Sequence, residues 1–472
     1  MKSLDTKKIT ITAAKKMLAD KEISASELFT AHHDVITARN ADLNAFLEVY
    51  AVQEHGQGIL AGIPGAIKDN ILIEGRRCTA ASKILENYTA TYDATVINKL
   101  RAAGAVFLGK TNLDEFAMGT TGENSAFGPT RNPLDTSRVA GGSSSGSVAA
   151  VAGGLAMFAL GSDTGGSIRL PAALCGVVGL KPTYGRVSRH GLIAMASSLD
   201  QIGPITRTVE DSASVFNAIA GHDLMDSTTV PHDVPDFTAE LKKSVKGLKA
   251  AVPEEFFGEG LAPGVRVKVE EAIATLQKLG IAVERVRVPL TEYALAAYYV
   301  LVPSEISANL ARYDGVRYGL SAPHAVNYTE QYKEARHAGF GPETRRRIII
   351  GTYVLSAGYY DAYYKQAQKV RSLYIREYDK LFKTYDIVIG PTSPMLAPKL
   401  GELADPLAMY LADVYTVPAN LTGLPAISVP CGLAPADDDG TLLPVGLQII
   451  GRAFDEATIL RAAYALEQSL SS

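Results

Sequence analysis

The stretch that decides the fold is residues 138–167, RVAGGSSSGSVAAVAGGLAMFALGSDTGGS, in which fourteen of the thirty residues are glycine or serine. These small residues form two groups, 141–147 and 161–167, and an apolar run, 148–160, separates them. A flexible linker would not contain so apolar a run of residues. We therefore expect the run to be buried and the glycines to permit close backbone approach. Consecutive amide N–H groups in such a loop can bind an oxyanion, and a serine that ends the loop is a candidate nucleophile.

The composition describes a folded chain without a strong electrostatic preference. Hydrophobic residues make up 47% and charged residues 20% of the 472 residues, which excludes a mostly disordered or fibrous chain. The formal net charge is −4, so no overall basic field exists to hold a polyanion. Any nucleic acid would therefore need a local patch or a partner.

Cysteine usage and the N-terminus predict a cytoplasmic protein without a metal. Cys78, Cys175 and Cys431 are too few and too scattered for a disulfide framework or a zinc site, and no His/Asp/Glu cluster has ligand spacing. Residues 1–12 lack the apolar region and cleavage site of a secretory signal. The charge-free window 139–162 could span a bilayer by length, but its Gly/Ser-rich first third is too polar. We therefore expect no membrane segment.

The pattern along the chain predicts an α/β fold with one central sheet. After two helices near 9–20 and 24–39, short apolar runs alternate with amphipathic stretches, which is typical of a sheet covered by helices on both faces. Strand candidates at both ends of the chain favour a single discontinuous core over a string of domains. They are 45–50, 105–108, 250–253, 387–390, 426–430 and 445–451. A long helix is expected over 343–385, broken near Gly358, while 223–246 and 321–341 are polar excursions.

A serine nucleophile needs a base, and the histidines offer no candidate. Most of the eight histidines stand in polar stretches, where a solvated or locally bonded imidazole is expected, and His190 lies in a turn sequence. A lysine can serve if burial makes the neutral amine accessible. Lys68 follows an apolar run of small residues, 62–67, at a predicted strand end, so it is either a surface lysine or a buried base.

Three blocks of sequence resemble the amidase-signature family: 65–70 (GAIKDN), 141–147 (GGSSSGS) and 161–169 (GSDTGGSIR). They stand in that family's order, and the resemblance runs from about 61 to 204, behind a helical cover at about 1–42. It implies a single domain over 1–472 and a triad of Ser167 as nucleophile, Ser143 as bridging serine and Lys68 as base. It also implies that the Gly142–Ser143 peptide is cis. The oxyanion hole would be formed by the backbone N–H groups of Thr164, Gly165, Gly166 and Ser167. Ser145 departs from the family pattern, which usually has glycine there.

Further strings resemble one subfamily, the A subunits of tRNA-dependent glutamyl-tRNA(Gln) amidotransferases. They are 114–119 (DEFAMG), 123–125 (ENS), 181–189 (KPTYGRVSR) and 351–364 (GTYVLSAGYYDAYY), so the likeness covers nearly the whole chain. It implies hydrolysis of glutamine, with Arg347 binding the α-carboxylate, Asp413 the α-ammonium and Tyr298 lining the pocket. Since three arginines are consecutive, Arg346 is an alternative to Arg347.

The same resemblance implies partners rather than cofactors in this chain. Ammonia would pass to a B subunit that holds the tRNA and activates misacylated Glu with ATP and Mg²⁺, and a small C subunit would brace the pair. The present chain would need no cofactor of its own. Whether Asp-tRNA(Asn) is also a final substrate stays open.

Other functions are also open to the sequence. A literal Walker A string, 104–111 (GAVFLGKT), has the wrong context, because its middle residues form an apolar run expected of a buried strand. A free-standing amidase for aliphatic or aryl amides shares the triad and would differ in the pair Arg347 and Asp413. A scaffold without catalysis is disfavoured because Lys68, Ser143 and Ser167 are all present.

Overall fold

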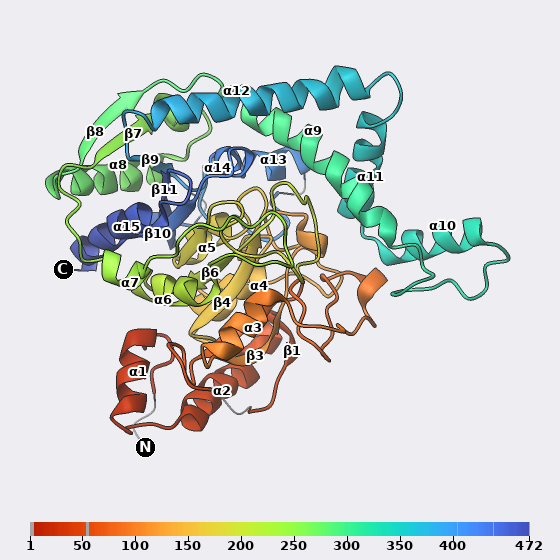
Figure 1. The fold of residues 1–472 in the computed structure, drawn as a ribbon, viewed down its shortest axis with the longest axis horizontal. Helices are drawn as coiled ribbons and strands as arrows, with labels where there is room; N and C mark the ends of the chain where they lie inside the picture. Colours follow the sequence, from red (N-terminus) through yellow and green to blue (C-terminus); the bar gives the residue numbers. More distant parts are fainter. Residues whose placement is uncertain (1–3, 53–55, 404, 438, 472) are drawn as a thin grey trace.

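The computed structural model describes residues 4–52, 56–403, 405–437 and 439–471. Its centre is a mixed 11-stranded sheet (Figure 1). In sheet order the strands are β1 (Phe46–Val49), β3 (Val106–Thr111), β2 (Pro64–Lys68), β4 (Phe158–Asp163), β6 (Gln201–Thr206), β5 (Val178–Lys181), β10 (Ala426–Pro435), β11 (Leu442–Gly451), β9 (Ile387–Pro391), β7 (Lys249–Pro253) and β8 (Ala282–Val286). Strands from both ends of the chain thus join one sheet, as predicted.

Helices cover both faces of this sheet. They are α1 (Ile11–Ala19), α2 (Ala25–Leu43), α3 (Thr95–Ala102), α4 (Ser145–Ala152), α5 (Arg169–Cys175), α6 (Val209–Ile219), α7 (Phe237–Glu240), α8 (Pro263–Lys278), α9 (Thr291–Asn309), α10 (Tyr328–Gly339), α11 (Pro342–Val354), α12 (Lys365–Leu381), α13 (Pro406–Leu411), α14 (Val417–Leu421) and α15 (Glu456–Ser471). The two faces follow from side-chain alternation along a strand. In β4, Phe158 and Leu160 pack into the core with α3 and α6, while Ala159 between them packs with α4 and α5. The predicted α/β fold class is confirmed.

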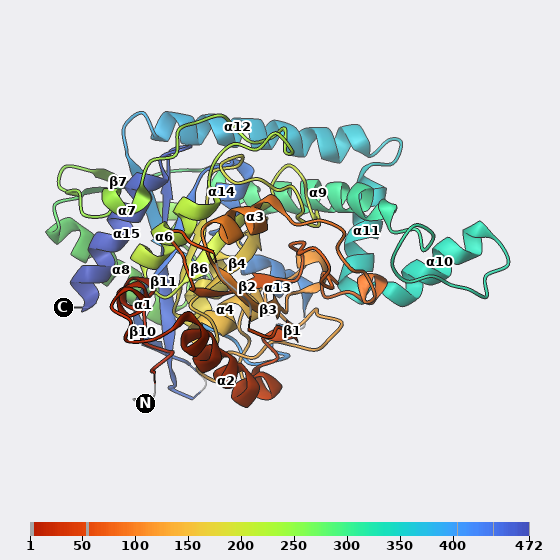
Figure 2. The same ribbon diagram turned by 60° about the horizontal axis from the view of Figure 1, so that its bottom comes forward.

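The helix predicted over 343–385 is broken, as expected, near Gly358, whose φ of 88° interrupts the regular backbone. Helix α11 ends at Val354, and α12 begins at Lys365 after a π-helical turn, Tyr360–Tyr364. The polar segment 321–341 contains a helix that the sequence pattern did not predict: α10, capped by the Asn327 side chain. Figures 1 and 2 place α10 at the tip of an extension beyond the sheet.

Parallel pairing explains why the first sequence block lies beside the third. Strand β2 pairs in parallel with β4, with Ile67 opposite Leu160, so both strands end at the same edge of the sheet. Lys68 is the last residue of β2, and Ser162 and Asp163 end β4. The loop 164–168 then leads directly into α5, and this edge therefore carries the residues singled out from the sequence.

The Walker A string does not form a phosphate-binding loop. Its residues Val106–Thr111 are the fully buried strand β3, as the apolar pattern predicted. The Lys110 ammonium is buried, pairs with Asp69 at 3.1 Å and donates to the Ile71 carbonyl at 2.7 Å. Within the described residues, each helix is too short or too polar to cross a bilayer.

Candidate active site

Lys68 lies at the centre of the site with no exposed surface. Its Nζ donates to Ser143 Oγ at 2.8 Å, Ser144 Oγ at 2.9 Å and Ser162 Oγ at 2.9 Å, and lies 3.3 Å from the Ser162 carbonyl. Burial lowers the pKa of Lys68 to about 7, although nearby carboxylates, Asp114 first among them, raise it in part. A large fraction of this amine is therefore neutral near pH 7 and can accept a proton.

Ser143 reaches Lys68 from the turn that precedes α4. The Gly142–Ser143 peptide is cis, as the family resemblance implies. Ser143 is fully buried, and its backbone carbonyl accepts a hydrogen bond from the Asp114 N–H at 3.2 Å. Ser145, which departs from the family pattern, is accommodated as the first residue of α4, and its hydroxyl donates to Thr130 Oγ1 at 3.1 Å.

Ser167 stands between β4 and α5, and a backbone hydrogen bond joins its loop to the Ser143 turn. The Ser144 N–H donates to the Ser167 carbonyl at 3.1 Å. Ser167 is only 8% exposed, and its hydroxyl forms no hydrogen bond with a protein group among the described residues. It is therefore free to turn toward Ser143 or toward a substrate carbonyl.

One of the four amides predicted for the oxyanion hole already has an acceptor in the structure. The Gly166 N–H donates to Asp163 Oδ1 at 2.9 Å, so this amide is already used to shape the loop. For Thr164, Gly165 and Ser167, the structure gives no protein acceptor to the N–H within the described part of the chain. These three amides remain available to a negatively charged oxygen. The backbone at Gly166, with φ of 141°, explains why glycine stands there.

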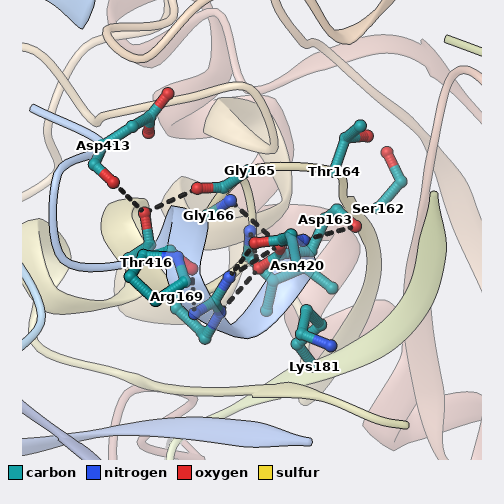
Figure 3. A network of polar contacts seen from close by, with 12 residues as sticks. Ser162, Asp163, Thr164, Gly165, Gly166, Arg169, Lys181, Asp413, Thr416 and Asn420 are labelled. Carbon is teal, nitrogen blue, oxygen red and sulfur yellow. Dashed lines mark hydrogen bonds and ion pairs between the residues drawn. The ribbon is translucent and has the colours of Figure 1, made fainter. Parts of the chain in front are cut away.

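A buried ion pair fixes the loop from below (Figure 3). Arg169 binds both oxygens of Asp163 at 3.0 Å, and it also donates to Asn420 and to the Thr416 carbonyl. The Ile168 N–H donates to Asp163 Oδ2 at 3.2 Å, so the amides on both sides of Ser167 bind one carboxylate. Although burial raises the pKa of Asp163, the charge of Arg169 holds it at about 2. The loop 164–168, which carries Ser167 and is called the nucleophile loop below, is thus folded around a carboxylate that stays ionised.

Arg347 is held inside the protein by an acid and two aromatic rings. Its Nε donates to Glu343 Oε1 at 2.8 Å, and its guanidinium carbon lies 5.4 Å and 5.2 Å from the ring centres of Tyr299 and Tyr410. The Arg347 side chain is 3% exposed, whereas that of Arg346, which also pairs with Glu343, is 44% exposed. Of the two arginines that the sequence left open, Arg347 is the one on the buried side.

Asp413 and Tyr298 lie beside the nucleophile loop. The Thr416 hydroxyl donates to the Gly165 carbonyl at 2.6 Å and lies 3.1 Å from the Asp413 carbonyl, which links the two segments (Figure 3). Tyr298 packs so closely on Gly165 that a Cβ there would lie 2.3 Å from the tyrosine oxygen. Burial raises the pKa of Asp413 to about 8, opposed by the nearby Arg347 charge and by the Tyr299 hydroxyl, which donates to Asp413 at 3.2 Å.

Several residues of the site were missed by sequence reasoning. Ser144 and Ser162 both contact Lys68. They stand in two of the quoted blocks, but a run of serines does not show which hydroxyl faces the amine. Arg347 is surrounded by Tyr299, Glu343 and Tyr410. In the sequence, only their closeness to the predicted site residues could have indicated them. Among the described residues there is no cluster of His, Cys, Asp and Glu that could hold a metal ion.

A protein-family model and several known proteins match this chain over nearly its full length. The protein-family model described as Amidase matches residues 11–460. The A subunit of glutamyl-tRNA(Gln) amidotransferase from Moorella thermoacetica is 56% identical over 96% of this chain and 95% of its own. The crystal structure of the same subunit from Thermotoga maritima is 48% identical, with a TM-score of 0.84 over 98% of this chain and 95% of that one. Native peptide amidase from Stenotrophomonas maltophilia is 30% identical, with a TM-score of 0.81 over 98% of this chain and 97% of that one.

Proposed function

The chain belongs to the amidase family and is an amidase-signature hydrolase, and we propose that it is the glutamine-hydrolysing subunit of a tRNA-dependent amidotransferase. One observation carries the proposal: a buried amine bonded to Ser143 lies in the same site as a cation and an acid that suit an amino acid's two charges. Lys68 and Ser143 supply the first part, and Arg347 and Asp413 the second. The relatives named as A subunits of glutamyl-tRNA(Gln) amidotransferase support the choice of glutamine.

In the proposed reaction, neutral Lys68 accepts the Ser143 proton while Ser143 accepts the proton of Ser167. Ser167 Oγ then attacks the amide carbon of glutamine, and the free amides of Thr164, Gly165 and Ser167 receive the oxyanion. The proton returns along the same path to the leaving nitrogen, which departs as ammonia. Water next attacks the glutamyl ester by the same relay and releases glutamate. Glutamine and water thus become glutamate and ammonia.

Glutamine would be oriented by its head group. The Arg347 guanidinium would bind the α-carboxylate, and the Asp413 carboxylate would bind the α-ammonium beside Tyr298. Asp413 holds a proton at neutral pH in the free protein because burial raises its pKa to about 8. An arriving ammonium would favour loss of this proton, so glutamine binding should release a proton to the solvent.

The partners belong to the same proposal. We infer a B subunit that receives the ammonia, binds the misacylated tRNA and uses ATP and Mg²⁺, together with a small C subunit. This chain itself would need no cofactor and would work in the cytoplasm. Its net charge of −4 suits a protein that leaves RNA binding to its partner.

The test measures ammonia release from glutamine, asparagine and a simple aryl amide, by the chain alone and with its candidate B and C subunits. We expect glutamine to be preferred and the partners to increase its hydrolysis, and Ser167→Ala to retain less than about 1% of the activity. A lone chain that prefers the aryl amide, with no gain from partners, would instead be a free-standing amidase. Substantial residual activity of Ser167→Ala would remove Ser167 as the nucleophile.

A further inference from the structure

Residues 114–116, Asp-Glu-Phe, connect the turn of Ser143 with the start of α11. Their backbone is unusual, because Phe116 and the following Ala117 have φ of 50° and 63°, in the left-handed region. This bend places neighbouring side chains in different directions. The string stood out in the sequence, but the triad and the clamp formed by Arg347 and Asp413 do not use it directly.

Glu115 caps the helix that carries Arg347. Its Oε2 accepts a hydrogen bond from the Gly341 N–H at 2.8 Å and from the Thr344 hydroxyl at 2.6 Å, at the start of α11. Gly341 is the N-cap residue of α11 and has no side chain to cap the helix itself. A Cβ at Gly341 would lie 2.6 Å from Glu115 Oε2, so glycine leaves room for the acid. A carboxylate at a helix N-terminus is stabilised by the unpaired N–H groups there.

The other oxygen of Glu115 is also bonded. The Ser82 hydroxyl donates to Oε1 and lies 3.1 Å from the Gly339 carbonyl, at the end of α10. Glu115 is 2% exposed although it carries a carboxylate, and each contact comes from a segment remote in sequence. Such a buried carboxylate holds its hydrogen-bond partners in place, because breaking any of these bonds leaves a buried polar atom without a partner.

Asp114 ties the same segment to the triad. Its N–H donates to the Ser143 carbonyl at 3.2 Å, and its carboxylate accepts from the Gly122 and Asn124 N–H groups at 3.1 Å and 2.9 Å. A Cβ at Gly142 would lie 1.9 Å from Asp114 Oδ2, so this carboxylate packs directly on the Gly142–Ser143 turn.

Phe116 adds an apolar contact to the same connection. Its ring lies 5.1 Å from that of Tyr313 and 5.7 Å from that of Phe340, the residue before the Gly341 cap. The start of α11 is therefore held by a ring contact and by hydrogen bonds from one short segment. Further along α11, Gly351 packs against the Pro303 carbonyl of α9, where a Cβ would lie 1.8 Å away.

We propose that Glu115 is a positioning residue that fixes the Arg347 helix relative to the Ser143 turn, and so sets the distance between the glutamine head group and the reacting amide. This inference rests on the proposed glutaminase function. Arg347 lies one helical turn beyond Thr344, so a shift at the capped end of α11 moves the guanidinium. The triad contacts of Lys68 do not pass through Glu115, so chemistry at the amide should survive its loss.

The test compares kcat and KM for glutamine in the full chain, purified with its candidate partner subunits. In Glu115→Gln, we expect KM to rise at least about ten-fold while kcat stays within about two-fold. Thr344→Val removes one bond from the helix side and should raise KM about three-fold. Glu330→Gln is the matched control: it changes an exposed acid in the first turn of α10 and should leave both constants unchanged.

A fall in kcat without a rise in KM would overturn the proposal, because it would assign Glu115 to the triad rather than to the clamp. Unchanged constants in both variants would overturn it as well. If Glu115→Gln does not fold, Thr344→Val decides alone, and an unchanged KM counts against the proposal. The unmodified protein separates the two hypotheses: if it releases no ammonia from glutamine, the proposed function fails first, and this inference fails with it.

Discussion

Lowering the pH from 8 to 6 should slow the turnover of saturating glutamine about ten-fold, because Lys68 must be neutral to accept a proton. At an ordinary lysine pKa of 10.5, about one amine in 3,000 would be neutral at pH 7. Burial lowers the pKa of Lys68 to about 7, which makes about half of the amines neutral. From pH 6 to pH 8 the neutral fraction then rises from about one-tenth to about nine-tenths.

The assay measures kcat by ammonia release between pH 5.5 and 9, with glutamine saturating at each pH, so that the profile reports the substrate complex. Lys68→Arg is the companion variant, since a guanidinium stays charged throughout this range, and kcat should fall by about 10²- to 10⁴-fold. A kcat that is flat between pH 6 and 8, or that rises only near pH 10, would refute the argument that burial prepares this amine. Substantial activity of Lys68→Arg would refute it independently.

Three further predictions concern the clamp, the core and the loop. Ionisation of Asp413, whose pKa burial raises to about 8, should lower the KM for glutamine about five-fold between pH 7 and 8, and Asp413→Asn should raise KM and remove this slope. Arg169→Met leaves the Asp163 carboxylate buried without its cation, so the free energy of unfolding in urea should fall by about 3–5 kcal/mol. Lys268→Met, which removes a partly exposed ion pair with Glu271, should change that free energy by less than about 1 kcal/mol, and equal effects would contradict the role of burial. Gly165→Ala should displace Tyr298 and reduce glutamine kcat/KM by about 100-fold or more, whereas Gly258→Ala, with no heavy atom closer than 3.7 Å, serves as the control. Wild-type kinetics in Gly165→Ala would show that Tyr298 need not stay against this loop.

Much of the fold could be predicted because its signals are local. Short apolar runs and helical periodicity involve only neighbouring residues, so they predict strands at 105–108 and 250–253, which the structure has at 106–111 and 249–253, and a helix break near Gly358. Helix α10 was missed because its sequence is polar on most sides, and its N-cap at Asn327 is a weaker signal than an apolar stripe. The sequence does not separate Arg347 from Arg346, because consecutive residues differ only in the direction they face on a helix.

The sequence alone determined which side chains were available for the chemistry: the Gly/Ser blocks, a lysine after a buried strand and the acid and arginine of the clamp. Only the tertiary structure decided how they act. The pKa of Lys68 depends on burial by segments that lie far apart in the sequence, and its three serine contacts come from the turn before α4 and from the end of β4. The family resemblance implies an oxyanion role for the Gly166 amide, whereas the structure shows its N–H donating to the Asp163 carboxylate, which Arg169 fixes. Electrostatic and hydrogen-bond partners are set by distance in space, and distance in sequence does not encode them.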